Sequence, residues 1–254
     1  MATALIKKLE GFVHLSAEER DALTKAASER VRRIRAREDI IREGDSPRDV
    51  NLVLEGWACR YKTLEDGRRQ IIAFFIPGDM CDLDISMLHE MDHSIGALTA
   101  LTFAEISRST IDRLMATYPR IHQALAWQAL VSAAVQREWT VNIGQRNATE
   151  RLAHLFCELF LRLRAVGRTH GDICEMPVTQ TELAEATGLT PVHVNRTLQD
   201  LRASGLIVLK GRELRIPDLA ELQRVSLFHP NYLHLDHEGA QFDANGGEIK
   251  PVVE

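Results

Sequence analysis

Apolar and polar positions follow different periods in successive parts of the chain. Residues 4–37 are predicted to be helical, and Ser16 with Glu19 forms a capping box at the start of a helix. Residues 38–107 consist of short alternating runs separated by turn residues, among them Asp66-Gly67, which favours a tight hairpin. Many short strands at this spacing are typical of a β-roll or jelly roll, whose interior is a natural cavity for a small molecule.

A long helical segment follows at about residues 111–146. It carries more apolar side chains than one face packed on the roll requires, including Leu130, Val135 and Trp139. Two interpretations stay open: a well-buried core helix, or a helix that packs on its own roll and also on the same helix of a second copy. The heptad register is poor, so the second interpretation depends on surplus apolarity alone. With this dimerisation helix, residues 1–146 form the predicted sensor domain.

Two capped helices around a glycine are the sharpest feature of the sequence. Thr179 and Glu182 form a second capping box, and Gly188 supplies a tight turn. Thr190-Pro191 is an N-cap followed by proline at the first helical position, where its missing N–H costs nothing. This order is typical of a helix-turn-helix, with residues 190–203 as the recognition helix.

Two short strands over residues 205–216, joined by a basic turn with a glycine, are typical of a wing after such a pair of helices. Residues 147–220 are therefore predicted to form a winged helix-turn-helix domain. Residues 221–254 are predicted to be a surface extension, partly disordered, because residues 238–254 are Gly-rich and acidic. The predicted fold class is α+β with two domains.

The composition of the chain argues against several classes of protein. The net charge is −5, so nucleic-acid binding has to be local. No apolar run approaches the roughly 20 residues of a membrane span, and the first residues do not resemble a secretory signal, which predicts a cytoplasmic protein. The cysteines lack C-x-x-C spacing, which argues against disulfides, a zinc ribbon and an iron–sulfur cluster. We expect the thiols of Cys59, Cys81, Cys157 and Cys174 to be reduced and partly buried. For Cys81, a redox role and an inert role both stay open.

Four motifs occur in a specific order and spacing. They are Ile40-Ile41-Arg42-Glu43-Gly44-Asp45, Phe75-Ile76-Pro77-Gly78-Asp79, Ala104-Glu105-Ile106-Ser107, and the helix-turn-helix with its wing. Together they resemble the Crp–Fnr family of bacterial transcription regulators over about residues 10–217. The resemblance implies a homodimer that holds two half-sites of a pseudo-palindromic double-stranded DNA and contacts RNA polymerase. It implies no enzymatic activity, and no cofactor is predicted.

The resemblance also implies which residues contact DNA. Arg196 is the best candidate for bidentate contact with guanine O6 and N7, and Asn195 would read adenine or a phosphate. Where many relatives have an arginine or glutamate in the first turn of the recognition helix, this chain has Pro191 and Val192, so the operator cannot be transferred from them. The base-facing residues are Pro191, Val192, Asn195 and Arg196 with His193 adjacent; the phosphate-holding residues are Thr179, Thr181 and Thr190, with Lys210 and Arg212 on the wing.

The sensor departs from relatives that bind cyclic AMP. The arginine–serine pair that holds their cyclic phosphate corresponds here to His93-Ser94, and a histidine expected to be neutral at pH 7 cannot replace arginine. Carboxylates at Asp82 and Asp84 would repel a phosphate. The sequence therefore predicts no useful affinity for cyclic AMP, while the effector, or the need for one, stays unknown. The candidate effector-binding residues are Asp82, Leu83, His93, Ser94, Gln136 and Arg137.

A rival motif points to an enzyme. Residues 89–93, His-Glu-Met-Asp-His, match the H-E-x-x-H zinc signature, in which both histidines share one face of a helix. The third ligand position of the longer version holds Thr99, and the surroundings resemble a loop. A cupin-like metal-binding protein or metallohydrolase that uses His89 and His93 is thus the alternative function; a metal-sensing role with Asp82 and Asp92, or a vestigial sensor filled by side chains, also stays open.

Overall fold

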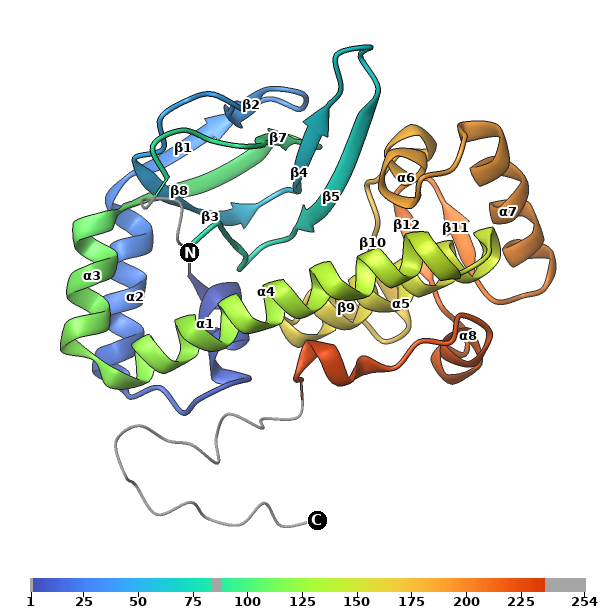
Figure 1. Cartoon of the computed structure of the whole chain (residues 1–254). Helices are drawn as coiled ribbons and strands as arrows, with labels where there is room; N and C mark the ends of the chain where they lie inside the picture. The colour runs from blue at the N-terminus through green and yellow to red at the C-terminus, as the bar shows by residue number, and fades with distance from the viewer. Residues whose placement is uncertain (1, 84–87, 236–254) are drawn as a thin grey trace, which may run out of the picture.

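The structure is a computed structural model, and it describes residues 2–83 and 88–235. Figure 1 shows a strand-rich part and a second part of helices and short strands, with the long helix α4 running beneath both. Within the described ranges, none of the helices is long and apolar enough to cross a membrane.

The strand-rich part is the expected β-roll. Its two four-stranded sheets have the orders β1-β8-β3-β6 and β2-β7-β4-β5, and all pairs are antiparallel. The turn at Asp66-Gly67 joins β4 to β5: Leu64 donates its N–H to the Arg68 carbonyl at 2.8 Å, and Gly67 has φ +86°. The strands are β1 (Val31–Ile34), β2 (Asp39–Ile41), β3 (Asp49–Glu55), β4 (Ala58–Thr63), β5 (Arg69–Phe75), β6 (Met80–Cys81), β7 (Ser94–Ala97) and β8 (Leu101–Ser107).

The N-terminal segment differs from the prediction of a helix through residue 37. The structure has α1 (Thr3–Glu10) and α2 (Ala17–Glu29), with the expected capping box at the start of α2, and then strand β1. Val31 pairs with Ala104 of β8, and Arg32 forms an ion pair with Glu105 at 2.7 Å. Pairing with a distant strand therefore overrides the helical tendency of an arginine-rich segment.

The long helical segment is divided at Tyr118. Helix α3 (Arg108–Thr117) ends there, and α4 (Pro119–Gln145) begins with proline at its first position, as Pro119 suggests. One face of α4 is buried against its own chain through Ile121, Leu125 and Trp139. The other face carries exposed apolar side chains, so α4 is not a core helix buried on all sides.

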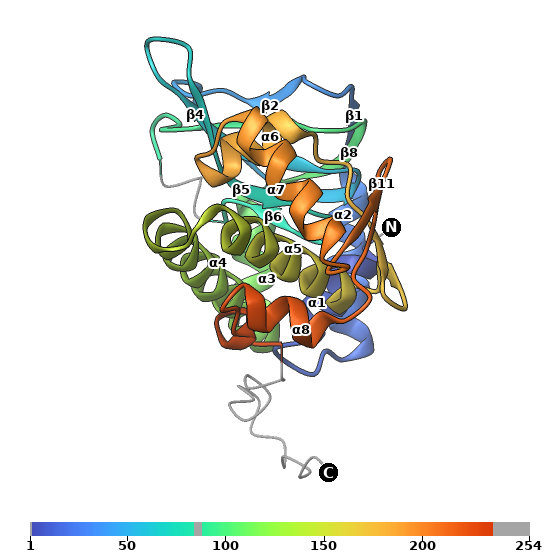
Figure 2. The same cartoon turned by 90° about the vertical axis from the view of Figure 1, so that its right-hand side faces the viewer.

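The second part contains the expected helix-turn-helix and wing. Helix α5 (Ala148–Ala165) begins with a capping box of Asn147 and Glu150 and is buried along most of its length. It packs against α7, α6 and α8 (Leu219–Val225), and Figure 2 shows α5 between α7 and α8. The remaining elements are β9 (Thr169–His170), β10 (Ile173–Glu175), α6 (Gln180–Thr187), α7 (Pro191–Ala203), β11 (Val208–Lys210) and β12 (Glu213–Arg215), with the strands in the order β11-β12-β10-β9.

The prediction of a surface extension after residue 220 is wrong for residues 221–235. Phe228 and Tyr232 are buried, and both rings contact the ring of His154 on α5. The Tyr232 hydroxyl donates to the Glu158 carboxylate at 3.0 Å, and a short 3₁₀ helix, η2 (Pro230–Leu233), contains this tyrosine. We call residues 226–235 the C-terminal segment; the predicted disorder of residues 238–254 lies outside the described residues.

The two parts share a core. Phe74 of β5 packs between Trp57 and Trp139, with ring centroids 6.4 and 5.8 Å away, and belongs to the same apolar cluster as α5. Helix α6 lies against β5, where Arg69 and Glu185 approach to 3.6 Å. The division of the chain into domains at residue 147 stays a prediction.

Candidate nucleic-acid interface and sensor site

Capping fixes both helices of the helix-turn-helix. The Thr179 side chain accepts from the Glu182 N–H at 3.2 Å, and the Glu182 carboxylate accepts from the Thr179 N–H at 2.7 Å. Gly188 has φ +67°, a left-handed conformation that only glycine adopts cheaply. The Thr190 hydroxyl then accepts from the His193 N–H at 3.2 Å to begin α7. Each local signal in the sequence corresponds to an interaction in the structure.

The inner face of α7 is apolar, as the spacing predicts. Val194, Leu198 and Leu201 are buried in one cluster with Leu183 of α6. Its outer face carries the expected DNA-contacting residues. Val192 is 80% exposed, and Arg196 is exposed and forms no ion pair or hydrogen bond with any described residue. Thr179, Thr181, Thr190 and Pro191 are also exposed, and His193 and Asn195 are half-buried.

A chain of amides joins the two helices on this outer face. Asn195 donates its Nδ2–H to Gln180 Oε1 of α6 at 3.0 Å and accepts from Gln199 Nε2 at 3.0 Å. Sequence reasoning did not identify Gln180 and Gln199. The four-residue spacing of Asn195 and Gln199 indicates a pair on one helix face, but the contact to α6 depends on the helix crossing.

The wing presents two cations. Lys210 and Arg212 are exposed on either side of Gly211, which has φ +61° in the turn between β11 and β12. The Arg212 carbonyl accepts from the Met176 N–H at 2.7 Å, which ties the turn to the segment after β10. Arg215 forms an ion pair with Asp172 at 2.7 Å.

The sensor residues expected near an effector form an ion-paired cluster. His93 Nε2 lies 2.9 Å from Asp82, and its Nδ1 lies 2.6 Å from Asp92. Arg60 of β4, which sequence reasoning missed, forms a close ion pair with Asp82 and lies over the Phe75 ring at 5.3 Å. Burial alone would lower the pKa of His93, but its contacts with Asp82 and Asp92 raise it. The two carboxylates therefore favour the protonated form of His93 more than the sequence suggests.

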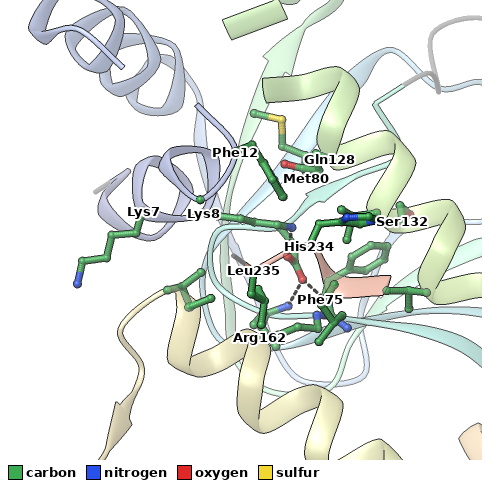
Figure 3. Close-up of a pocket in the computed structure, with 18 of the residues that line it drawn as sticks. Lys7, Lys8, Phe12, Phe75, Met80, Gln128, Ser132, Arg162, His234 and Leu235 are labelled. Atoms are coloured by element: carbon green, nitrogen blue, oxygen red, sulfur yellow. Dashed lines mark hydrogen bonds and ion pairs between the residues drawn. The ribbon is translucent and has the colours of Figure 1, made fainter. Parts of the chain in front are cut away.

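The candidate effector residues do not all meet. Leu83 follows Asp82 in the chain, and the Ser94 hydroxyl accepts from the Glu43 N–H at 3.0 Å. Arg137 is exposed on α4. Gln136 donates to the Ile72 carbonyl at 2.7 Å and lines a separate pocket (Figure 3), to which Asp82, His93 and Ser94 do not contribute. Asp84 lies outside the described residues.

The rival zinc motif is not helical. Residues 89–93 form bends, and the Met91 N–H donates to the Asp45 carbonyl at 2.8 Å. Both ring nitrogens of His93 face carboxylates, from Asp82 and Asp92. In the described part of the chain, no group of three or more His, Cys, Asp or Glu side chains is arranged to hold a metal ion. The helical geometry that a metallohydrolase needs is therefore contradicted.

All the cysteines are free and buried. Burial raises the pKa of the thiols of Cys59, Cys157 and Cys174 to about 12 and that of Cys81 well above its ordinary value. Because the thiolate is the reactive form, this favours the inert alternative for Cys81.

Both parts of the chain match known protein families. Residues 31–118 match the cyclic nucleotide-binding domain family, and residues 150–225 match the Crp-like helix-turn-helix domain family. The nitrogen fixation regulation protein FixK of Bradyrhizobium diazoefficiens is 28% identical over 189 residues, covering 74% of this chain and 78% of the relative. The transcriptional activator protein FnrL of Cereibacter sphaeroides is 29% identical over 195 residues, covering 75% and 78%.

The solved structure of FixK2 from Bradyrhizobium japonicum shares the fold, with a TM-score of 0.68 at 24% identity; the match covers 76% of this chain and 95% of that one. The cyclic nucleotide-binding-like roll followed by the Crp-like helix-turn-helix is thus the arrangement that the sequence predicts. The chain belongs to the Crp–Fnr family of transcription regulators, which are not enzymes.

Proposed function

We propose that the protein binds double-stranded DNA as a homodimer and reads a pseudo-palindromic site with α7 in the major groove. The observation that carries this proposal is the outer face of α7, where Arg196 is exposed and has no partner among the described residues, on a helix whose start is capped by Thr190. A base contact contributes most to the binding free energy when the side chain that makes it gives up no hydrogen bond or ion pair within the protein.

Each side chain on this surface has a proposed role. Arg196 donates two hydrogen bonds to guanine O6 and N7. Asn195, oriented by Gln180 and Gln199, contacts adenine or a phosphate with its remaining N–H, and His193 lies beside it. Pro191 and Val192 offer apolar contact to a thymine methyl group. The hydroxyls of Thr179, Thr181 and Thr190, and the cations of Lys210 and Arg212, hold phosphates.

The exposed face of α4 supports the dimer. Its exposed residues recur with alternating steps of four and three, the spacing of a two-helix seam. Leu130 on this face is 60% exposed, and small residues beside it permit close approach of a second helix. This spacing was hidden in the sequence because other apolar residues of α4 face its own chain. The residues of the stripe are Ala126, Leu130, Ala133, Arg137, Thr140 and Gly144.

We further propose that the DNA-bound dimer works in the cytoplasm and contacts RNA polymerase, since a relative of similar length is named a transcriptional activator. We also propose that it does not bind cyclic AMP usefully. Arg60 and His93, the basic side chains in the expected phosphate region, are already paired with Asp82. Calorimetric titration with cyclic AMP that gave a micromolar dissociation constant would overturn the second proposal.

The test of DNA reading is selection of bound sequences from a random pool without added ligand. The wild type is compared with Arg196→Ala and with Arg224→Ala, a matched control because Arg224 is exposed on α8 and pairs with Glu221. We expect a two-fold-symmetric motif that keeps all preferences in the control and loses one base preference per half-site in Arg196→Ala. A motif unchanged by Arg196→Ala would contradict the proposed base contact, and an asymmetric motif would contradict the dimer.

A further inference from the structure

A pocket of about 310 Å³ lies between α1, β5, α4, α5 and the C-terminal segment. Its volume falls in the range of roughly 300–1,000 Å³ that small-molecule sites occupy. The residues Arg60, Asp82 and His93 do not line this pocket, and neither do the residues proposed to contact DNA. Because α5 and the C-terminal segment follow residue 147, a molecule in this pocket would touch both predicted domains.

Most of the lining is apolar. Phe12 from the turn after α1, Phe75 from β5, and Val131 and Val135 from α4 contribute, together with Leu235 of the C-terminal segment (Figure 3). Phe12 is held in place by stacking on Trp127, with ring centroids 6.1 Å apart. This wall suits the apolar body of a ligand.

One end of the pocket carries an excess of positive charge. Lys8 Nζ lies 2.6 Å from Asp79, and Arg162 lies 2.8 Å from the other oxygen of the same carboxylate. The side chain of Asp79 is 4% exposed, while those of Lys8 and Arg162 are 21% and 17% exposed. Lys8 has three N–H donors and one of them is used, so the others are available to a second anion.

The two cations share a single carboxylate inside the pocket. Burial opposes ionisation of Asp79, but Lys8 and Arg162 lower its pKa, so this carboxylate is the counter-ion of both. Glu158 contacts Arg162 at 3.1 Å from outside the pocket lining. Its hydrogen-bond partners Trp139, Tyr232 and Arg162 are all donors, so Glu158 accepts from each of them.

A buried amide lines the pocket at another point. Gln128 of α4 is 5% exposed, and its Oε1 has no hydrogen-bond partner among the described residues. Figure 3 shows this side chain beside Phe12 and Met80. An unpaired buried acceptor costs stability unless a donor reaches it, so the pocket offers this oxygen to a hydrogen-bond donor on a ligand.

We propose that the pocket binds an amphipathic organic acid that also carries a hydroxyl or amide N–H. The acid group pairs with Lys8 at the Asp79–Arg162 end, the apolar body lies along Phe12, Phe75 and Val131, and the hydroxyl or N–H donates to Gln128.

Calorimetric titration of the full-length protein without DNA tests this proposal, and its outcome is separate from that of the DNA selection. The probes are 3-hydroxydecanoate, decanoate and 1-decanol. We expect one site per chain, with 3-hydroxydecanoate bound several-fold more tightly than decanoate and at least tenfold more tightly than 1-decanol. Failure of both acids to bind at millimolar concentration, or equal binding of 1-decanol, would overturn the proposal.

Variants locate the site. Val131→Phe fills the pocket and should reduce binding of the acids at least tenfold. Gln128→Leu removes an unpaired polar group, so its melting temperature should be no lower than that of wild type. It should abolish the tighter binding of 3-hydroxydecanoate relative to decanoate and leave decanoate binding unchanged. His93→Gln is the control, since His93 does not line this pocket. Binding lost in His93→Gln but kept in Val131→Phe would place the acid in the roll and overturn the proposal.

Discussion

Cations on the outer face of α7 and cations in the interior of the protein have opposite surroundings. Arg196 has no partner among the described residues, whereas Arg60 pairs with Asp82, and both Lys8 and Arg162 pair with Asp79. An exposed cation is solvated by water until phosphate or base atoms replace that water, but a buried cation must have its counter-ion inside the protein. The proposed DNA-contacting surface therefore has a cation without an internal counter-ion, while each of these interior cations has a carboxylate partner in the protein.

The largest effect should come from breaking the packing between the two regions. Phe74→Ala removes the ring between Trp57 and Trp139, and we expect the free energy of unfolding to fall by about 3–5 kcal/mol. Urea denaturation measures this loss. Leu64→Ala, at a side chain 52% exposed in the hairpin turn, should change stability by less than about 0.5 kcal/mol. Equal effects of the two variants would show that Phe74 does not join the regions.

Arg196→Ala should separate DNA affinity from stability. Its loss should cost about 1–3 kcal/mol of DNA-binding free energy per half-site, and the melting temperature should stay close to that of wild type because Arg196 is exposed and forms no ion pair or hydrogen bond with the described residues. Fluorescence anisotropy with the selected DNA measures the affinity. A large loss of thermal stability would contradict the exposed position of this side chain.

The turn of the helix-turn-helix depends on a backbone conformation. At Gly188 an added Cβ would meet Ile143 at 3.7 Å, an ordinary contact, so the cost of Gly188→Ala comes from φ +67°. We expect a loss of about 1–2 kcal/mol in the free energy of unfolding. Gly188→Asn should lose less, because asparagine adopts this conformation more readily than alanine. The opposite order of the two variants would contradict a backbone origin.

The smallest effect concerns pH and the sensor. The pKa of His93 is raised in the folded protein, so its contribution is fully present below the unfolded pKa of about 6.5 and is lost as pH rises through the folded pKa. The stability advantage of wild type over His93→Gln should shrink, by less than about 1 kcal/mol, between pH 6 and pH 9. Asp92 stays ionised in this window because its hydrogen bond with His93 lowers its pKa. An advantage that grows with pH would contradict the raised pKa of His93.

The same contrast explains what sequence reasoning could reach. The helix-turn-helix was predictable because each of its signals is local. The caps, the glycine turn and the wing follow one another between Thr179 and Arg212, and each is formed by residues only a few positions apart. The Crp–Fnr arrangement was also predictable, because its motifs have a specific order. Pairs such as Lys8 with Asp79 or Arg162 with Asp79 are separated by 71 and 83 positions, and no local period records them.

Two errors have the same origin. The arginine-rich segment at residues 31–34 is a strand because β8 lies beside it, and Phe228 and Tyr232 are buried because α5 offers His154 and Glu158 as partners. In both cases the local sequence is ambiguous and a distant segment decides the structure. The stripe on α4 was obscured for a related reason, since its residues are interleaved with those that face the protein's own core.

The contact between Tyr232 and Glu158 also bears on the order in which the newly made chain can fold. Glu158 lies in the middle of α5, but its tyrosine partner is synthesised 74 residues later, and the neighbouring ring contact to His154 also waits for Phe228. During translation, α5 therefore emerges with one side of its core uncovered. That side can close only after residues 228–232 have left the ribosome, so a segment far along the chain decides when the core around α5 is complete.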